Sequence, residues 1–516
     1  MTSLARSIGA LLVLGGLAGC GCEGAPATTV HDAGVDGEAP SERDAALPSD
    51  AREPRHFLSV SVIGGGVLEI GGARCVRECD LELAHGERVE LVPSADPGFA
   101  LARFEGDCGG AACALEMDRD HVVSARFEAT PSVLLGLAGP VTDIEALDDG
   151  GAWIAGGGEI AWRVGVYGEV VARVASPAIE VGALAVDGEG AWLVGTDEGG
   201  AFLVHVDGAG VAREPRIVTS DASADCSAIE RTPDGGAIVG CAYGGTLQLR
   251  RFDASGELMW GRAFLTPRLG TAISPIAALR VAPDGDVMIA VTFEGAIGLV
   301  GTRLTTRGEA DVAVARLRAA DGDLVWSRRI GSAAGYPSIE SATGLALTED
   351  GDPVIVGLLS EGATLSGAEG DERGAVELAV PHAQSASVVR LSREDGSLVW
   401  ARFPSSEFGV PVDVAVQGER LVVLSLERAR GPVAERSIEG PALIALALDP
   451  GTGDERAMST LPVDESGAGV EWGALALTGG DAVWLAAELW HDVTLGAVSV
   501  SSVDSDAVLA RVIVDR

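Results

Sequence analysis

Short segments in which apolar and polar residues alternate follow one another along most of the chain. The clearest is Ala310–Ile330, which has the pattern of a strand, a tight Asp-Gly turn and a second strand that contains a Trp. Closely similar phrases return at Ser385–Phe403 and at Thr246–Phe264. Alternation with a period of two is typical of strands with one buried face, and helical periodicity is nowhere sustained. We therefore expect an all-β protein built on a repeat.

Seven repeat units can be counted between residues 132 and 516. Each opens with a strand that leads through an acidic-Gly or Gly-Gly turn into a second apolar strand, and further strands follow. The units begin near Val141, Val181, Cys226, Ile276, Thr343, Pro411 and Trp472. Asp-Gly and Gly-Gly suit tight hairpins that require positive φ. Antiparallel strands that recur in fours predict a seven-bladed β-propeller.

The two ends of the repeat region complement each other. The last unit stops after a third strand, AVLARVIVDR, whereas the strand at Ser132–Ala138 precedes the first unit without belonging to it. We expect this N-terminal strand to complete the last blade, because that pairing closes the ring and removes two unpaired edges.

The units resemble the SBBP-type β-propeller repeat of exported bacterial proteins. The resemblance rests on the run Gly308–Leu317 and its echo at Asp504–Arg511. The Trp phrase of the fourth strand also resembles quinoprotein propellers, although their vicinal cysteines and calcium site are not found in this sequence. The resemblance implies a fold and leaves function open.

Residues 56–129 alternate in the same way but lack the repeat, so they are predicted to form a small β-rich module. The succession of a strand, GGGV, a strand, a Cys-x3-Cys pair, GERVELVP and FEGDCGGAAC resembles the divergent internalin-type B-repeat of bacterial surface proteins. That family usually has Trp where Phe104 stands. The resemblance implies a stalk or adhesion module without catalysis.

The first twenty residues have the pattern of an export signal. Arg6 supplies a positive charge, and the apolar run Ile8–Leu17 is too short to cross a bilayer about 30 Å thick. The run ends in Leu-Ala-Gly-Cys, which resembles the lipobox of bacterial lipoproteins. The resemblance implies removal of residues 1–19 and lipid attachment to Cys20, and Gly21 implies sorting to the outer membrane. The alternative is an ordinary secretory signal that happens to contain a Cys.

Residues 20–55 are rich in Ala, Pro, Asp, Glu, Gly and Ser and contain few large apolar residues. Such a segment buries too little surface to offset the entropy of ordering, so it is predicted to be a disordered tether. A membrane, reached through the lipid anchor, is the first expected partner.

The cysteines other than Cys20 and Cys22 fall into three close pairs: Cys75 with Cys79, Cys108 with Cys113, and Cys226 with Cys241. An exported chain meets an oxidising compartment, which favours disulfides. The first two pairs could instead supply four thiolates to a metal. Their spacing and their acidic neighbours disfavour this alternative, since zinc sites usually have Cys-x2-Cys or Cys-x4-Cys spacing and compensating basic residues.

The charge and the missing residue types exclude several function classes. The net charge of −39 argues against nucleic acid as a partner, because phosphate binding requires a basic face. The chain contains no Lys and no Asn, which excludes a P-loop lysine, a Schiff-base lysine and an Asn-dependent triad.

Few residues suggest a metal or a catalytic site. Acidic turns such as Asp148–Gly150, Asp284–Asp286 and Asp350–Asp352 offer too few oxygens for calcium and are interpreted as hairpin turns. The seven histidines are scattered and are interpreted as isolated surface or edge residues. The sequence contains no Gly-x-Ser-x-Gly nucleophile elbow. Glycoside hydrolysis uses a pair of carboxylates, and the 76 acidic residues offer many pairs without a pattern that selects one. We predict no cofactor and no metal.

Tryptophans and long links supply the remaining candidates. Trp153, Trp192 and Trp484 occupy one equivalent position in their units, which predicts packing between blades. The links between second and third strands lengthen in the last four units, and long loops on one face of a rigid scaffold often carry recognition. The candidate recognition residues there and in other connections are Tyr336, Arg303, Arg307, Arg373, His382, Arg430 and Trp490. These links could instead contain an extra hairpin of the repeat.

The sequence thus favours a non-enzymatic, outer-membrane lipoprotein that displays a propeller as an interaction platform for an unknown protein or envelope ligand. The alternative is a propeller enzyme that acts on envelope polysaccharide, or a quinoprotein-like oxidoreductase. An enzyme is expected to have converging carboxylates, Arg or a bound ion at the centre of the propeller. A platform is expected to have only Val, Ala and Gly there.

Overall fold

The computed structural model describes residues 54–514 except 64, 96–98, 130–132, 138–140, 157–160, 175–179, 244–245, 266–277, 334–338, 368–373, 405–408, 428–430, 434–435, 439, 464–469, 479–481, 490–492, 496–497 and 501–506. Every regular element in these residues is a β-strand, so the prediction of an all-β fold is confirmed. Within this part of the chain, no helix is long and apolar enough to cross a membrane. The predicted signal peptide, Cys20 and almost all of the tether lie outside the described residues.

The small module consists of two four-stranded sheets. In hydrogen-bonding order these are β4 (Glu78–Ala84), β1 (Arg55–Ile63), β8 (His121–Ala129) and β6 (Phe99–Gly106), and β3 (Ala73–Cys75), β2 (Gly66–Ile70), β5 (Arg88–Ala95) and β7 (Cys113–Glu116). One face of each sheet is buried, with Leu58, Leu68 and Phe104 almost fully enclosed. Two short-range disulfides, Cys75–Cys79 and Cys108–Cys113, add to this core, as predicted.

The strands from β9 onward form consecutive four-stranded antiparallel units, each named here by its first strand. The β10 unit contains β10 (Val141–Ala146), β11 (Ala152–Gly156), β12 (Ala161–Val164) and β13 (Val170–Val174), and the β14 unit contains β14 (Glu180–Asp187), β15 (Gly190–Asp197), β16 (Gly200–Val206) and β17 (Arg216–Thr219). The β18 unit contains β18 (Asp225–Arg231), β19 (Ala237–Tyr243), β20 (Thr246–Phe252) and β21 (Leu258–Leu265), and the β22 unit contains β22 (Ala278–Val281), β23 (Val287–Leu299), β24 (Thr302–Leu317) and β25 (Leu324–Gly331). Pairing of β21 with β23 joins these two units into one continuous sheet.

Further units follow in the same style. The β26 unit contains β26 (Ser341–Leu347), β27 (Pro353–Ser360), β30 (Gln384–Leu391) and β31 (Leu398–Arg402), and the β32 unit contains β32 (Gly409–Gln417), β33 (Arg420–Glu427), β36 (Ala442–Leu448) and β37 (Glu455–Pro462). The β38 unit contains β38 (Val470–Leu477), β39 (Ala482–Leu489), β42 (Ala507–Ile513) and β9 (Val133–Leu137). The strand from the beginning of the repeat region therefore pairs with the last strand of the chain, as the sequence predicted.

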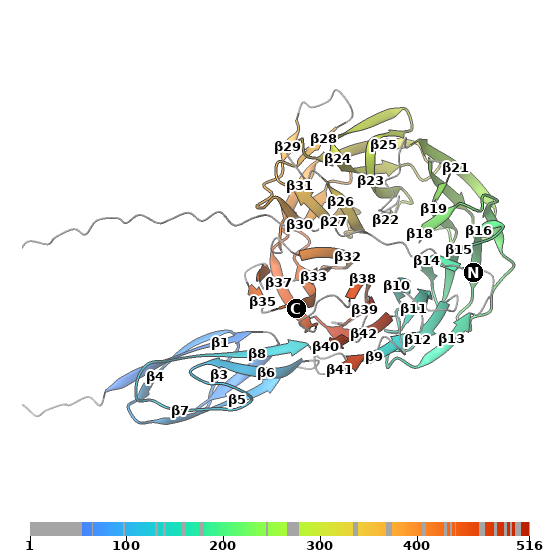
Figure 1. Ribbon diagram of the computed structural model, residues 1–516. Helices are drawn as coiled ribbons and strands as arrows, with labels where there is room; N and C mark the ends of the chain where they lie inside the picture. The colour runs from blue at the N-terminus through green and yellow to red at the C-terminus, as the bar shows by residue number, and fades with distance from the viewer. Residues whose placement is uncertain are drawn as a thin grey trace, which may run out of the picture. The chain divides into compact units, whose positions relative to one another are not determined.

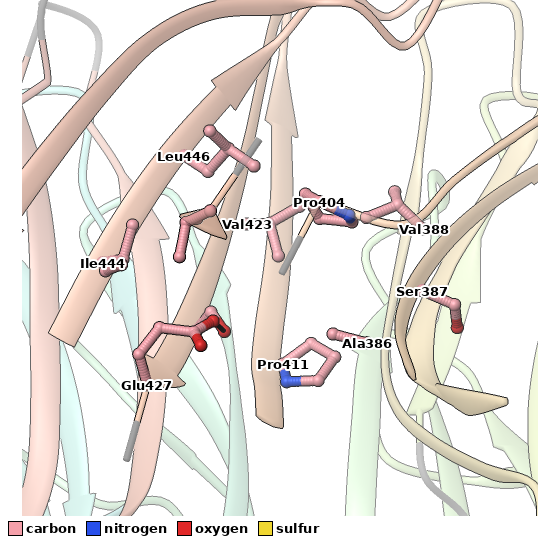
Figure 2. Close-up of a pocket in the computed structure, with 11 residues that line it drawn as sticks. Ala386, Ser387, Val388, Pro404, Pro411, Val423, Glu427, Ile444 and Leu446 are labelled. Atoms are coloured by element: carbon pink, nitrogen blue, oxygen red, sulfur yellow. Dashed lines mark hydrogen bonds between the residues drawn. The ribbon is translucent and has the colours of Figure 1, made fainter. Parts of the chain in front are cut away.

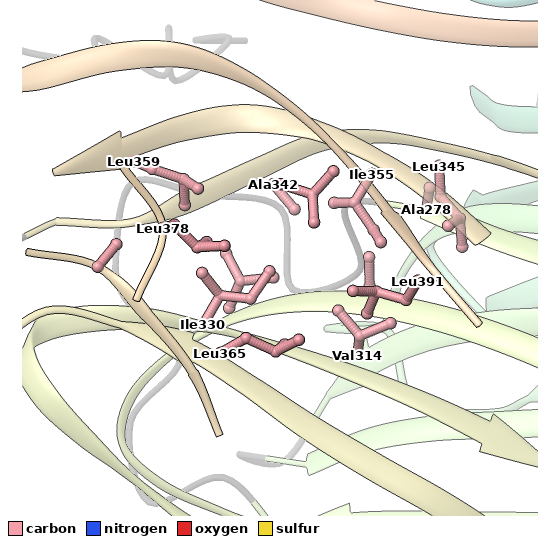
Figure 3. Packing of buried hydrophobic residues seen from close by; sticks show 14 of the residues in the cluster. Ala278, Val314, Ile330, Ala342, Leu345, Ile355, Leu359, Leu365, Leu378 and Leu391 are labelled. Carbon is pink, nitrogen blue, oxygen red and sulfur yellow. The ribbon is translucent and has the colours of Figure 1, made fainter. Parts of the chain in front are cut away.

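Hydrophobic clusters lie between successive units and lead from each unit to the next. Figure 3 shows the cluster between the β22 and β26 units, where Val314 and Ile330 pack with Leu345 and Ile355. Another cluster joins the β38 unit to the β10 unit through Trp484 and Ile154. First strands of neighbouring units pack side by side, and Figure 1 shows them on the inner side of the units. This arrangement is that of a β-propeller.

Tryptophans connect neighbouring units, as predicted. Trp153 and Trp484 are fully buried, and Trp192 is nearly so. The indole N–H of Trp153 donates to the Glu189 carbonyl at 3.0 Å, and that of Trp484 donates to the Gly150 carbonyl at 3.1 Å. Fourth-strand tryptophans act in the same way, because Trp260, Trp326 and Trp400 each donate to a backbone carbonyl of the following unit.

The long links between second and third strands contain hairpins. In the β22 unit, β23 and β24 extend past the neighbouring strands, and Gly298 of β23 pairs with Leu265 of the preceding unit. In the β26 unit the link forms β28 (Thr364–Ser366) and β29 (Val376–Glu377), and β28 pairs with β25 of the preceding unit. The later links contain β34 (Gly431–Val433) with β35 (Arg436–Ile438), and β40 (Val493–Leu495) with β41 (Val498–Val500). These links thus match the extra hairpin that the sequence left open.

Candidate functional site

Charged residues occupy equivalent positions on the first strands of several units. The register between the first and second strands of each unit shows which residues are equivalent from one unit to the next. The charged residues fall at two such equivalent positions, which lie two residues apart along the first strand and are called here the first and second tier. The first tier contains Asp143, Ala183, Ala228, Ala278, Gly344, Asp413 and Ala474, and the second contains Glu145, Ala185, Glu230, Arg280, Ala346, Ala415 and Ala476. Every uncharged member is Ala or Gly. The small side chains leave the charged ones as the dominant chemistry of the inner strands.

The two aspartates of the first tier tie neighbouring units together. Asp143 accepts one hydrogen bond from the N–H of Ile144 at 2.8 Å and another from Leu184 of the β14 unit at 3.0 Å. Asp413 repeats this arrangement with Val414 at 2.8 Å and with Leu475 of the β38 unit at 2.9 Å. Both oxygens of each carboxylate are therefore used to satisfy backbone donors at a β-bulge and across a unit boundary.

The second tier contains a partly buried arrangement of two acids and one base. Glu145 accepts a hydrogen bond from the N–H of Val186 in the next unit at 2.6 Å. Arg280 lies 3.3 Å from the carboxylate of Glu230, and its guanidinium also donates to the Leu279 carbonyl at 2.9 Å. The side chains of Arg280 and Glu230 are 35% and 19% exposed, so the pair is enclosed without being dry.

Burial and mutual repulsion change the protonation of these acids. Burial raises the pKa of Glu145 to about 8, and the charges of Glu230 and Asp143 act in the same direction. Burial likewise raises the pKa of Glu230 to about 7 although Arg280 opposes the change, and it raises the pKa of Asp413 to about 6. Burial acts to lower the pKa of Arg280, but the surrounding carboxylates outweigh it and leave that pKa raised. The glutamates can therefore hold protons near neutral pH.

This cluster can exchange protons and hydrogen-bond a ligand, but its acids do not surround a metal position. Among the described residues, no group of three or more His, Cys, Asp or Glu side chains is arranged to hold a metal ion. The sequence led us to expect converging carboxylates and Arg at the centre of an enzyme, and only Val, Ala and Gly at the centre of a platform. The cluster is closer to the expectation for an enzyme. Its aspartates, however, are engaged in joining units.

The acidic turns have a structural use, as their interpretation as hairpin turns implied. Asp286 lies 2.7 Å from the guanidinium of Arg316 on the third strand of the same unit. That guanidinium also donates to the Arg393 carbonyl of the next unit at 3.0 Å. Equivalent pairs join Asp149 to Arg163, Asp234 to Arg251 and Asp352 to Arg390. The turns thus anchor arginines that connect consecutive units.

A second buried polar group lies beneath the extended hairpin of the β22 unit. Asp311 and Glu340 are both fully buried. Asp311 accepts a hydrogen bond from the Arg307 N–H at 2.9 Å, and Glu340 accepts one from the Ser332 hydroxyl at 2.7 Å. Burial raises the pKa of Asp311 to about 6, and the negative charge of Glu340 adds to the effect. These contacts hold the base of the hairpin in place.

Three of the seven predicted recognition residues lie among the described residues, and four do not. Arg303 and His382 are exposed, while Arg307 donates to the Thr364 hydroxyl at 3.1 Å and so connects two hairpins. Tyr336, Arg373, Arg430 and Trp490 lie outside the described residues. Recognition by these residues stays a prediction.

A narrow pocket between the β26 and β32 units is unsuited to a larger ligand. Figure 2 shows that Val388, Val423, Ile444 and Leu446 line it together with Glu427. Its enclosed volume of about 10 Å³ accommodates a single water molecule. The pocket therefore offers no place for a substrate.

Sequence reasoning missed both tiers and one histidine pair. Aligning the repeats would have revealed the tiers, because TDIEA, SAIER, AALRV and VDVAV place their charges where GALAV has only Ala. The prediction of isolated histidines was wrong for His56 and His85, whose ring nitrogens lie 3.0 Å apart. These two residues are 29 positions apart, so no local motif marks them.

No protein-family model matches the chain, and no curated protein matches it. Solved structures with a similar arrangement include BamB from Moraxella catarrhalis, 16% identical over 73% of this chain and 99% of that chain, with a TM-score of 0.40. YCF48 bound to D1 peptide is 13% identical over 74% of this chain and 96% of that chain, with a TM-score of 0.41. The Cps50 (Swd1) β-propeller domain of Myceliophteria thermophila is 12% identical over 73% and 97%, with a TM-score of 0.43.

Proposed function

We propose that the protein is an outer-membrane lipoprotein that displays a seven-bladed β-propeller and a small β-rich module as a non-catalytic interaction platform. The observation that carries the platform proposal is the commitment of Asp143 and Asp413 to bonds between units. Polar groups that an enzyme would leave available for substrate are used here to hold the scaffold together. The lipid anchor rests on the Leu17–Cys20 motif.

The blade count and ring closure belong to this proposal. Seven repeat units in the sequence, the pairing of β9 with β42 and the bond from Trp484 to Gly150 support it. A closed ring leaves no exposed edge at the junction between its first and last blades, which suits a rigid platform.

The anchor is tested by labelling cells with a radioactive fatty acid and treating intact cells with protease. We expect the label on the wild-type chain and on Cys22→Ala, the matched control, and no label on Cys20→Ala. Removal of the propeller from intact cells indicates a surface-exposed platform, and protection indicates one that faces the periplasm. Equal labelling of all three chains, or of none, contradicts the anchor.

A second candidate, an enzyme that acts on envelope polysaccharide, is favoured by Glu145 and Glu230. Hydrolysis of a glycosidic bond requires a protonated and an ionised carboxyl group, and pKa values of about 8 and about 7 allow both near neutral pH. Release of reducing ends from purified envelope polysaccharide decides between the two. Activity that disappears in both Glu145→Gln and Glu230→Gln supports the enzyme, and no release by the wild-type chain supports the platform.

A further inference from the structure

We propose that His56 and His85 of the small module form a two-histidine binding site for a divalent transition-metal ion such as Zn²⁺ or Cu²⁺. His56 lies on β1, and His85 follows β4, the strand beside β1 in the same sheet. The topology therefore brings together two imidazoles that are far apart in sequence. Imidazole nitrogen is a preferred ligand of both metals.

The two rings are close enough to reach one metal ion. The Nε2 atom of His56 and the Nδ1 atom of His85 are 3.0 Å apart, and the ring centroids are 5.3 Å apart. Two imidazole nitrogens bound at about 2.0–2.1 Å with a tetrahedral angle lie roughly 3.3 Å apart, with centroids roughly 5 Å apart. Replacing the shared hydrogen bond by a metal requires a few tenths of an ångström of movement at the nitrogens and a turn of each ring by roughly 35°, so that both lone pairs point at the ion and not at each other.

A carboxylate lies near one of the two rings. Asp120 Oδ1 lies 3.7 Å from the Nδ1 atom of His56 and is held by the backbone N–H of Phe57 at 2.9 Å. A negative charge this close to the ring favours a bound cation. Carboxylates commonly support metal-binding histidines by accepting a hydrogen bond from the second ring nitrogen.

The surroundings favour a cation and leave the metal accessible. His85 is exposed and His56 is partly exposed, so an ion can reach both rings without opening the core. The net charge of −39 attracts cations to the chain. With two protein ligands, the remaining coordination positions stay available to water or to a ligand from another molecule.

The test measures Zn²⁺ binding by calorimetry on the full mature chain in which Cys20 and Cys22 are both replaced by Ser, so that no free thiol contributes. We expect the chain to bind about one Zn²⁺ ion at a single site. His56→Ala and His85→Ala should each abolish this binding. His382→Ala, which removes an exposed histidine elsewhere, is the matched control and should retain the site. Asp120→Asn should weaken binding by about tenfold.

A spectroscopic measurement separates the site from weak binding by scattered carboxylates. With one equivalent of Cu²⁺, electron paramagnetic resonance should show hyperfine coupling to two imidazole nitrogens. That signature should be lost in His56→Ala and His85→Ala and kept in His382→Ala. Identical calorimetric and spectroscopic results for all three variants would overturn the proposal.

Discussion

Replacing Glu145 by Gln should change the way in which the stability of the propeller depends on pH. In the folded protein the pKa of Glu145 is raised to about 8, chiefly by burial, whereas an unfolded glutamate titrates near its model value of 4.5. The folded chain therefore holds a proton that the unfolded chain has lost between these pH values. This contribution is fully present below about pH 4.5 and is lost as pH rises through about 8.

The magnitude follows from linkage. Between about pH 4.5 and pH 8, an acid whose pKa is raised in the folded chain lowers the equilibrium constant for folding by up to about tenfold for each pH unit of increase. Glu145→Gln stays neutral and can still accept the bond from the Val186 N–H through its amide oxygen. We expect the variant to be more stable than the wild type by roughly 2–4 kcal/mol near pH 8.5, and the two to converge near pH 4.5.

The assay is equilibrium denaturation in urea at half-unit steps from pH 4.5 to pH 9, followed by Trp fluorescence. All nine tryptophans lie between residues 153 and 490, so the signal reports the propeller and not the small module. Glu198→Gln, which changes an exposed glutamate, is the matched control and should run parallel to the wild type. If the free energy of unfolding depends on pH in the same way for Glu145→Gln and for the wild type, that result refutes the argument that Glu145 stays protonated in the folded chain.

Further predictions concern contacts that hold the units together. Trp484→Phe should lower the free energy of unfolding by about 1 kcal/mol through loss of the bond to Gly150, and Trp484→Ala by about 3–5 kcal/mol, both measured by urea denaturation. Joint replacement of Cys226 and Cys241 by Ala should cost about 3 kcal/mol, and reducing agent should then destabilise the propeller no further. Gly357→Ala should cost roughly 1–3 kcal/mol in thermal unfolding, because its methyl group would overlap a backbone oxygen of the neighbouring strand, whereas Ala at the open Gly440 position should not.

Much of the fold could be predicted because its signals are local. Alternation over four to eight residues determines which side of a strand is buried, and Asp-Gly determines where the chain reverses. The three disulfides join cysteines only 4, 5 and 15 residues apart, so closeness in the sequence already favoured them. Repetition strengthened each local signal and made the tryptophans at equivalent positions recognisable as contacts between units.

The candidate sites depend on contacts that no local pattern contains. Asp413 influences Arg280, and Trp484 bonds to Gly150, across separations of more than a hundred residues. Sequence alone determined which residues form strands and which side chains are apolar. Only the tertiary structure decided which charges meet on the inner strands and which two histidines face each other. The reason is that packing successive sheets around a common centre brings equivalent positions of distant units together, and it is this proximity that changes their pKa values.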